Sequence, residues 1–426
     1  MIAPRAKFLG NADFLVIVMF CLILVRVDGA WQAREGVTRL AETGEGSVSR
    51  QLTYLAIFAG CIGVYLHRFG PMTLHRLLPF PLMLLCLWAG LSLMWSDVPQ
   101  IALRRYGLTL VILMSLFSLC AFMPVDRVLR NLRHAILCLA GLSLATVVLL
   151  PELGVTQVSD IEAHNAGDWR GVFFHKNNAG AVFGVGLILA VHNLWTCGKP
   201  WRLWAWVWVL LLGGLLLMTG SKTSQAVSLA CGIILLMLLW ASRYRNGIGV
   251  IGTLAIFAGG VILGATLLYF GHSQDAPILS PDSFTGRGLI WAELMRMSEA
   301  SRLFGFGYGS VFQVGLESPL IQYFYNSNYL LGLSHAHNAY LELLITLGAV
   351  GLILAIWALI LAPFATWAGL SHDARGTTHL CLSLMMFGWA HGILESGLFD
   401  RDRTAWIIFL IAYGVLWTMG KTRQIS

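Results

Sequence analysis

The residues best suited to chemistry are a few cations and histidines at the ends of long apolar runs, and Lys222 is one of them. It lies in a short polar turn, Ser221-Lys-Thr223, which joins two such runs with almost no linker. A lysine at bilayer depth costs roughly 2.5–3.5 kcal/mol on insertion scales. Two interpretations remain open: a side chain that extends to the membrane interface, or a residue that binds an anion at the membrane boundary.

A second cation, Arg287, stands between two glycines in Phe284-Thr-Gly-Arg-Gly288, directly before an amphipathic stretch. Glycines expose backbone amides, and a helix N-terminus favours anions. A guanidinium adds planar, permanently charged donors that suit phosphate. Taken alone, a surface arginine in a turn is the simpler interpretation, but a second cation at a membrane boundary also fits a site for an anion.

Two histidines, His335 and His337, precede Asn338 where a polar segment enters an apolar run. Histidines two positions apart suggest a metal site, but on a helix they would point away from each other, and no carboxylate or cysteine accompanies them locally. A structural histidine at a helix start is one alternative. The other is a histidine that transfers a proton, because its pKa lies close to neutrality.

A fourth polar segment, Trp169 to Asn178, combines Arg170, Lys176 and Asn177 with aromatic residues. Cations suit phosphate, amides suit hydroxyl groups, and aromatic faces suit sugar rings. The mixture therefore fits a sugar phosphate, while an aromatic and basic belt beside the membrane is the alternative.

Two further patterns are weaker. Gly305-Phe-Gly-Tyr-Gly309 resembles a phosphate loop, but no Lys-Ser/Thr follows it, which favours a turn-rich loop. Asp400-Arg-Asp402 resembles the metal-binding pattern of nucleotide-sugar transferases. It falls on the predicted outer side of the membrane, and its own arginines can neutralise it.

The composition indicates which kind of molecule must position these residues. The chain has 426 residues, of which 57% are hydrophobic and 12% charged, whereas soluble domains carry about 25% charged residues. This excludes a cytosolic enzyme, a disordered chain and a nucleic-acid binder. The eight cysteines lie in or beside apolar runs without a CxxC pattern, which is typical of packing residues. The 16 Trp and 45 Gly fit a polytopic helical membrane protein.

The continuous apolar runs predict an all-α fold of about twelve transmembrane helices in a single membrane domain covering residues 1–426, because barrel strands would alternate instead. The first run is read as an uncleaved span and not as a signal peptide. The runs cover residues 14–27, 52–66, 77–95, 107–123, 134–150, 179–195, 203–219, 225–241, 248–270, 338–361, 379–394 and 404–420.

The charges predict the orientation of these spans. With the N-terminus inside, the inner segments hold half of the 28 Lys and Arg residues but only three of the 21 Asp and Glu residues. This asymmetry follows the positive-inside rule. It predicts that both termini are cytoplasmic and that the polar segments described above face outwards.

The largest outer segment, residues 271–336, separates the ninth and tenth spans, and a loop of this length is usually functional or disordered. Within it, residues 286–301 have the pattern of an amphipathic helix that could lie at the membrane surface. We expect the loop to form a structured lid, with Arg287, His337 and Lys222 facing one cavity. The residues predicted to share the apolar face of the helix are Ile290, Trp291, Leu294, Met297 and Ser298.

Together these segments resemble the O-antigen ligase and O-antigen polymerase superfamily of bacterial membrane glycosyltransferases, and most of all the exopolysaccharide repeat-unit polymerases. The order and outer placement of the segments carry the resemblance. The matching segments are Arg170-Gly-Val-Phe-Phe-His-Lys-Asn177, Ser221-Lys222, Thr285-Gly-Arg287 with Trp291, Leu303-Phe-Gly-Phe-Gly307 and His335-Ala-His-Asn-Ala-Tyr-Leu-Glu342.

The resemblance implies transfer of an oligosaccharide from a polyprenyl pyrophosphate to an acceptor hydroxyl, with inversion, on the periplasmic side of the bacterial inner membrane. Lys222 and Arg287 would hold the pyrophosphate, and His337 would deprotonate the acceptor. No metal and no cofactor are expected, because fixed cations can neutralise the leaving group. The remaining substrate-binding residues would be Arg170, Lys176, Asn177, His335 and Asn338.

Two alternatives accompany this interpretation. A ligase would move finished glycan onto lipid A core, and ligases of the family usually have arginine in the turn that holds Lys222. A transporter would need charges at mid-membrane depth, and most charges here lie in loops. The expected partners are the lipid-linked oligosaccharide, the glycan acceptor and membrane lipid, with a chain-length regulator and export proteins implied by the family.

Overall fold

A computed structural model describes residues 11–27, 31, 47–158, 165–243, 252, 287–324, 333–370 and 375–425. Over these residues the chain is helical, and its only β-type pairing is an isolated bridge between Val155 and Trp169. Eight of the described helices are long and apolar enough to cross a membrane, and two shorter helices are also apolar. The predicted all-α polytopic membrane fold is confirmed, while the ninth predicted span, residues 248–270, lies almost entirely outside the described residues.

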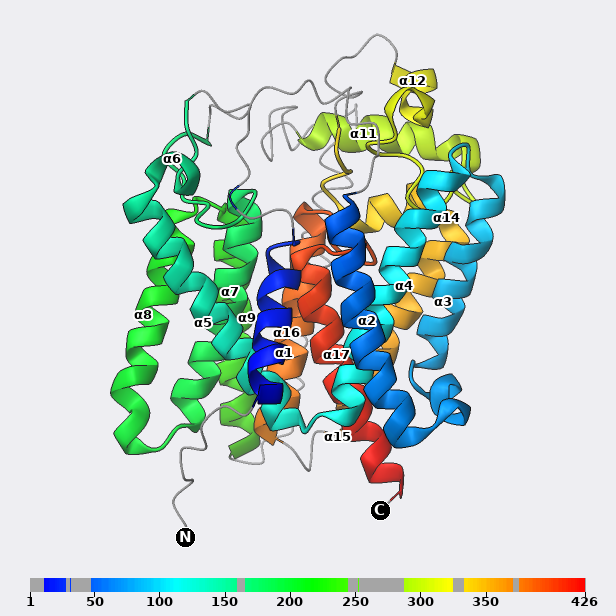
Figure 1. The fold of residues 1–426 in the computed structure, drawn as a ribbon. Coiled ribbons are helices and arrows are strands. Elements are labelled where there is room, and N and C mark those ends of the chain that lie inside the picture. Colours follow the sequence, from blue (N-terminus) through cyan, green and yellow to red (C-terminus); the bar gives the residue numbers. More distant parts are fainter. Residues whose placement is uncertain are drawn as a thin grey trace.

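The helices run back and forth along one bundle axis (Figure 1). The first half contains α1 (Asn11–Leu24), α2 (Val48–Phe69), α3 (Phe80–Leu91), α4 (Pro99–Phe122), α5 (Val125–Leu149), α6 (Pro151–Gly154), α7 (Lys176–Thr196), α8 (Arg202–Met218) and α9 (Lys222–Arg243). The second half contains α11 (Arg287–Ser298), α12 (Pro319–Phe324), α14 (Ala339–Ile356), α15 (Ala362–Leu370), α16 (Arg375–Leu394) and α17 (Thr404–Ile425), with a π-helical turn between α14 and α15 (Trp357–Leu361).

Short 3₁₀ turns join or extend several of these helices. They cover Pro71–Arg76, Ser92–Trp95, Lys199–Trp201, Glu299–Ser301 and Gly315–Glu317.

The centre of the bundle is formed by α16 and α17. Residues 378–389 of α16 and 404–416 of α17 are all buried. Polar side chains of α16 therefore contact other helices, and Ser383 donates to the carbonyl of Cys231 on α9 at 2.9 Å. This explains why α16 has a short apolar run in the sequence: a helix surrounded by other helices does not need a lipid-compatible surface.

The two ends of the bundle differ in what they carry. The beginning of α1 and the end of α17 lie at the same end, while α6, α11 and α12 lie at the opposite end (Figure 1). We call the latter the outer end. At the inner end Asp13 accepts from Arg127 at 3.0 Å and from Asn131 at 2.9 Å, which joins α1 to α5.

A break in α14 anchors the outer loop to the bundle. Gly348 has a φ of 70°, and a Cβ there would lie 2.1 Å from the carbonyl oxygen of Leu303. The loop enters this break, where the amides of Phe306 and Gly307 donate to the carbonyls of Ile345 and Thr346 at 2.9 Å each. These amides are occupied by α14, which agrees with the interpretation of residues 305–309 as a turn-rich loop.

The helix α11 lies across the outer end of the bundle (Figure 1). Its buried residues include all five that were expected to share an apolar face. That face packs against loop residues such as Phe312 and against Leu341 and Ile345 of α14. The apolar side of α11 is therefore covered by protein.

Candidate active site

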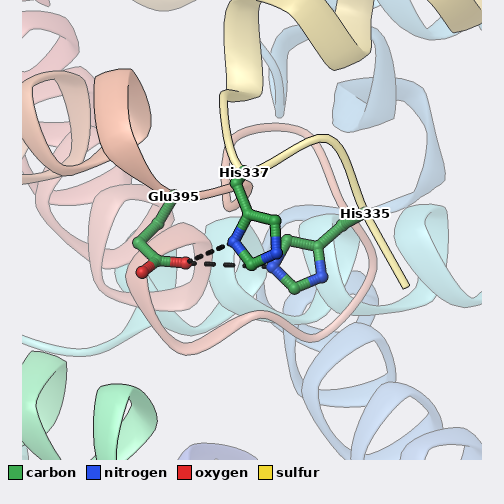
Figure 2. Close-up of side chains that lie close together, drawn as sticks. All are labelled: His335, His337 and Glu395. Atoms are coloured by element: carbon green, nitrogen blue, oxygen red, sulfur yellow. Dashed lines mark ion pairs between the residues drawn. The ribbon is translucent and has the colours of Figure 1, made fainter. Parts of the chain in front are cut away.

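The carboxylate of Glu395, directly after α16, brings several of the predicted site residues together at the outer end. Its Oε1 accepts from Arg287 Nη2 at 2.7 Å and from Asn177 Nδ2 at 2.8 Å. Its Oε2 lies 3.6 Å from His337 Nδ1 and 3.8 Å from His335 Nε2 (Figure 2). Glu395 is only 7% exposed. Four residues from three separate sequence segments therefore surround one buried carboxylate, and we call these five residues the Glu395 cluster.

The position of Arg287 is fixed by the start of α11. Arg287 is the first residue of this helix, and its Nη1 also donates to the carbonyl of Leu394, the last residue of α16. Further along α11, the indole of Trp291 donates to the carbonyl of Ala336 at 3.0 Å. The helix therefore holds both the arginine and the loop that carries the histidines.

The histidines lie in an extended segment and a turn, because α14 begins only at Ala339. The expectation that they would point apart on a helix is wrong for this reason: His337 has a φ of 53°, and the two rings lie with centroids 4.0 Å apart. Asn338 caps α14 by accepting from the amides of Tyr340 and Leu341 at 3.0 Å each. A left-handed conformation at a residue other than glycine is strained, and such strain is common at functional sites.

Charge and burial set the protonation states of the Glu395 cluster. Burial alone would raise the pKa of Glu395, but the two histidines and the Arg287 guanidinium hold that pKa well below its ordinary value. Burial, together with the positive charge of His337 when protonated and of Arg403, lowers the pKa of His335 to about 3. At neutral pH the site therefore contains an ionised carboxylate and a neutral His335.

Three side chains of this cluster could hold a metal ion. One ligand atom from each of His335, His337 and Glu395 lies within 4.8 Å of the others. The carboxylate is not a local one: folding brings Glu395 to the histidines from a distant part of the chain. An ion there would share Glu395 with the guanidinium of Arg287, whose charge opposes a cation.

The start of α7 supplies the remaining polar residues of this region. Asn177 reaches Glu395, whereas Lys176 forms an ion pair with Asp168 at 2.6 Å. Arg170 is 2% exposed and its Nε donates to the carbonyl of Leu153 at 2.9 Å. Of the three predicted residues in this segment, the structure brings Asn177 to the Glu395 cluster.

The Ser-Lys turn lies close to the same site. Lys222 is the exposed first residue of α9. Ser224, within the same helical turn, lies 3.3 Å from Nε2 of His391, which is one turn before Glu395 on α16. The turn is therefore linked to the cluster through His391, while the expectation that Lys222 itself faces the substrate stays a prediction.

Glu395 and His391 were not among the site residues predicted from the sequence. Both residues lie at the end of an apolar run that was interpreted only as a membrane span. A carboxylate at the C-terminal end of a helix opposes the helix dipole, and this was the one signal that marked Glu395 as unusual.

Comparison with known proteins finds a family match over part of the chain. Residues 207–356 match the O-antigen ligase family. The resemblance stated from the sequence is therefore confirmed, and the matched segment contains Lys222, Arg287, His335 and His337. Glu395 and Asn177 lie outside it.

Two curated proteins are similar to this chain. An O-antigen ligase of Pseudomonas aeruginosa is 27% identical over 215 residues, which cover 49% of this chain and 46% of the ligase. The exopolysaccharide production protein ExoQ of Rhizobium meliloti is 28% identical over 323 residues, 71% of this chain and 67% of that protein. The aligned part of the chain thus spans less than half of the ligase and about two thirds of ExoQ.

Proposed function

We propose that the protein is a membrane glycosyltransferase that polymerises polyprenyl-pyrophosphate-linked oligosaccharide repeat units into exopolysaccharide or O-antigen. The observation that carries the proposal is the Glu395 cluster, in which a cation suited to phosphate and a histidine suited to proton transfer share one buried carboxylate. Both residues lie in the segment that matches the O-antigen ligase family.

In this mechanism His337 is the general base. Its Nδ1 faces Glu395, so Nε2 is the nitrogen that accepts the proton of the acceptor hydroxyl. The hydroxyl oxygen attacks the anomeric carbon from the face opposite the pyrophosphate, the bond from that carbon to the phosphate oxygen breaks, and the configuration inverts. Glu395 stabilises the imidazolium that forms, as a carboxylate does for other catalytic histidines.

The leaving group takes the electron pair as polyprenyl pyrophosphate, and cations must neutralise its charge. Arg287 uses two nitrogens for Glu395 and Leu394 and retains further donors of its five N–H groups for a phosphate. Lys222, at the exposed start of α9, supplies a second cation. The proton on His337 then passes to water, which restores the base.

Two observations favour a polymerase over a ligase. The alignment with ExoQ, which is named for exopolysaccharide production, covers 71% of this chain, against 49% for the ligase. The Ser-Lys turn also has lysine where ligases of the family usually have arginine. A ligase that transfers glycan to lipid A core is the second candidate, because the matched family is named for that activity.

The deciding experiment incubates the purified full-length protein with its lipid-linked oligosaccharide, with and without lipid A core. A ladder of glycan lengths without lipid A core is the expected result. Transfer to lipid A core without a ladder would identify a ligase. If the wild-type protein gives neither product, the proposed function is wrong.

The proposal also places the protein in the bacterial inner membrane, with both termini cytoplasmic and the Glu395 cluster on the periplasmic side. The sequence supports this through the basic residues of the inner segments, and α1 begins at the same end of the bundle at which α17 ends. Fusing a reporter that is active only in the cytoplasm to the C-terminus tests the orientation, and an inactive reporter on a stably produced fusion would contradict it.

A further inference from the structure

A second polar cluster lies at the outer end in the connection between α16 and α17, and the mechanism above does not use it. Asp400 accepts from the Nε atoms of Arg401 at 2.7 Å and Arg403 at 3.0 Å. The neighbouring Asp402 is fully buried and pairs with Arg26 at 3.4 Å and with Arg50 at 2.5 Å. We call Asp400, Arg401 and Arg403 the arginine fork.

Among the described residues, positive charge exceeds negative charge in this region. The described carboxylates that interact with Arg26, Arg50, Arg105, Arg401 and Arg403 are those of Asp400, Asp402 and Glu342. Within this described set the arginines outnumber the carboxylates by two. Buried charges in proteins are normally paired, so this region is suited to an additional anion.

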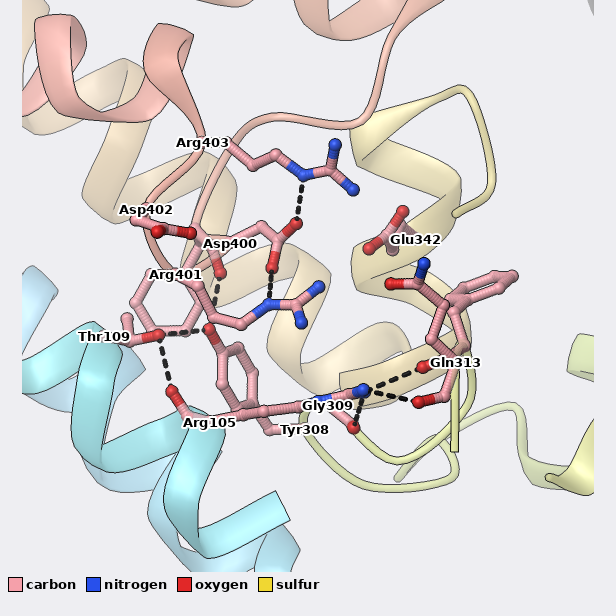
Figure 3. A network of polar contacts seen from close by, with 12 residues as sticks. Arg105, Thr109, Tyr308, Gly309, Gln313, Glu342, Asp400, Arg401, Asp402 and Arg403 are labelled. Atoms are coloured by element: carbon pink, nitrogen blue, oxygen red, sulfur yellow. Dashed lines mark hydrogen bonds and ion pairs between the residues drawn. The ribbon is translucent and has the colours of Figure 1, made fainter. Parts of the chain in front are cut away.

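The unpaired donors belong to the arginine fork. Arg105 is engaged by the loop, because its two terminal nitrogens donate to the carbonyls of Gly309, Phe312 and Gln313 at 2.6 to 2.7 Å. Arg401 and Arg403 use only their Nε atoms, and in the described part of the chain their terminal nitrogens contact no acceptor. Figure 3 shows both guanidinium groups pointing away from Asp400 toward the side where Glu342 lies.

The backbone holds these two groups in place. Phe399 has a φ of 53° and Arg401 a φ of 38°, which are left-handed conformations at residues other than glycine. The hydroxyl of Tyr308 donates to the carbonyl of Phe399 at 3.0 Å. A strained connection that is held by Tyr308 orients the two guanidinium groups before a ligand arrives, and the start of α17 adds the positive end of its dipole.

The fork lies close to the Glu395 cluster. The amide of Ala336, between the two histidines, donates to Glu342 at 3.1 Å, and Glu342 faces the fork. The charge of Arg403 also contributes to the low pKa of His335. The fork is therefore near enough to the histidines for one molecule to contact both.

We propose that Arg401 and Arg403 bind a phosphate group of the acceptor substrate, separately from the pyrophosphate of the donor at Arg287. This proposal rests on the proposed function, because a polymerase joins two lipid-linked molecules and each carries a pyrophosphate. Paired guanidinium groups suit phosphate because they provide several parallel donors. The same chemistry would accept a free phosphate, so the test must separate the two sources.

The test measures binding of radiolabelled farnesyl pyrophosphate to the full-length protein in lipid nanodiscs. We expect two sites in the wild-type protein. Arg403→Gln should weaken one of them about tenfold to a hundredfold and leave the other, while Arg287→Gln should weaken the remaining one. Unlabelled inorganic pyrophosphate that displaces the probe from the fork indicates recognition of the phosphate alone, and failure to displace it indicates that the lipid contributes.

Two controls keep the result interpretable. Arg403→Lys preserves the charge and should bind farnesyl pyrophosphate more tightly than Arg403→Gln does. This comparison separates a local effect from misfolding, and the melting temperature of each variant without ligand checks that it is folded. Arg50→Gln removes an arginine that pairs with Asp402 and should lower the melting temperature while both sites persist. A single site in the wild-type protein, or unchanged binding in Arg403→Gln, would overturn the proposal. Two sites that both persist unchanged in Arg287→Gln would instead contradict the proposed function.

Discussion

The Glu395 cluster and the arginine fork lie at the two ends of one short connection between α16 and α17, yet they are built in opposite ways. In the Glu395 cluster a single carboxylate is surrounded by Arg287, Asn177 and two histidines, so both of its acceptor oxygens are shared by several side chains. In the fork a single carboxylate serves two arginines, so donors remain in excess.

This difference shows how one connection can provide two kinds of function. The carboxylate of Glu395 orients a cation and a base and compensates their charges, which suits groups that change protonation during a reaction. The fork retains permanent positive charge that no proton transfer can remove, which suits binding of an anion. Variants in each region should therefore affect different quantities.

The largest effect is expected for His337→Ala. Loss of the general base should lower turnover about 10²–10⁴-fold, with binding of the lipid-linked donor largely retained because Arg287 and Lys222 remain. Turnover and donor binding, measured on the same purified protein, check this. Asp402→Asn is the matched control: it removes a buried charge that pairs with Arg26, just after α1, and with Arg50 of α2, so it should lower thermal stability and not turnover per folded molecule. If His337→Ala lost donor binding and kept its turnover per bound donor, the histidine would position substrate and would not be the base.

Substitutions of Arg287 should have the next largest effect. Arg287→Lys keeps the charge but cannot contact Glu395 and Leu394 together while also reaching a phosphate. We expect roughly a tenfold to hundredfold loss of turnover, the range for one charge-assisted hydrogen bond, and a larger loss for Arg287→Ala. Arg296→Lys on the exposed side of α11 is the control and should behave like the wild type. Equal activity of Arg287→Lys and the wild type would show that the planar guanidinium of Arg287 is not required.

Substitutions of Lys222 should separate charge from geometry. Lys222→Ala should weaken donor binding and turnover, because it removes a cation from the exposed start of α9. Lys222→Arg should stay close to the wild type, since ligases of the family usually have arginine in that turn. Donor titrations of the two variants provide the measurement. Normal donor binding in Lys222→Ala would show that Lys222 only extends to the membrane interface.

Much of the fold could be predicted because lipid imposes a simple requirement. A helix that faces lipid must be continuously apolar over about 20 residues, and α4, α5 and α9 show this directly in the sequence. The centre of the bundle obeys a different rule. α16 is enclosed by protein, so its polar Ser383 and His379 are tolerated and its apolar run is correspondingly short.

The site was only partly predictable for a related reason. Arg287, Asn177, His335 and His337 were recognised because each stands in a polar segment at the boundary of a predicted span. Glu395 was not, because its partners Arg287 and Asn177 are 108 and 218 positions away in the chain. Only the packing of α7, α11 and α16 brings them together, and no local pattern encodes that packing.

The titration of His335 predicts how the Glu395 cluster responds to acid. Its pKa of about 3 lies below the ordinary value of 6.5. Between these values the unfolded chain binds a proton that the folded chain lacks, so stability falls as the pH is lowered below 6.5, by about 2 kcal/mol at pH 5. The melting temperature should therefore drop between pH 7 and pH 5, and less so in His335→Asn. His75→Asn, at an exposed position, should retain the full wild-type drop. An equal drop in His335→Asn and the wild type would contradict this assignment.

The smallest effect is expected from removal of divalent metal ions. Although His335, His337 and Glu395 could bind a metal, Arg287 already neutralises Glu395, and fixed cations can stabilise the leaving pyrophosphate. Turnover should be unchanged in EDTA. Added zinc should inhibit instead, because zinc bound to His337 would prevent this residue from acting as a base and would replace its contact with Glu395. His335→Asn, which removes one ligand, should be less sensitive to zinc than the wild type. Loss of turnover in EDTA that magnesium or manganese restores would show that the three ligands form a working metal site and that the charge of Arg287 is not sufficient.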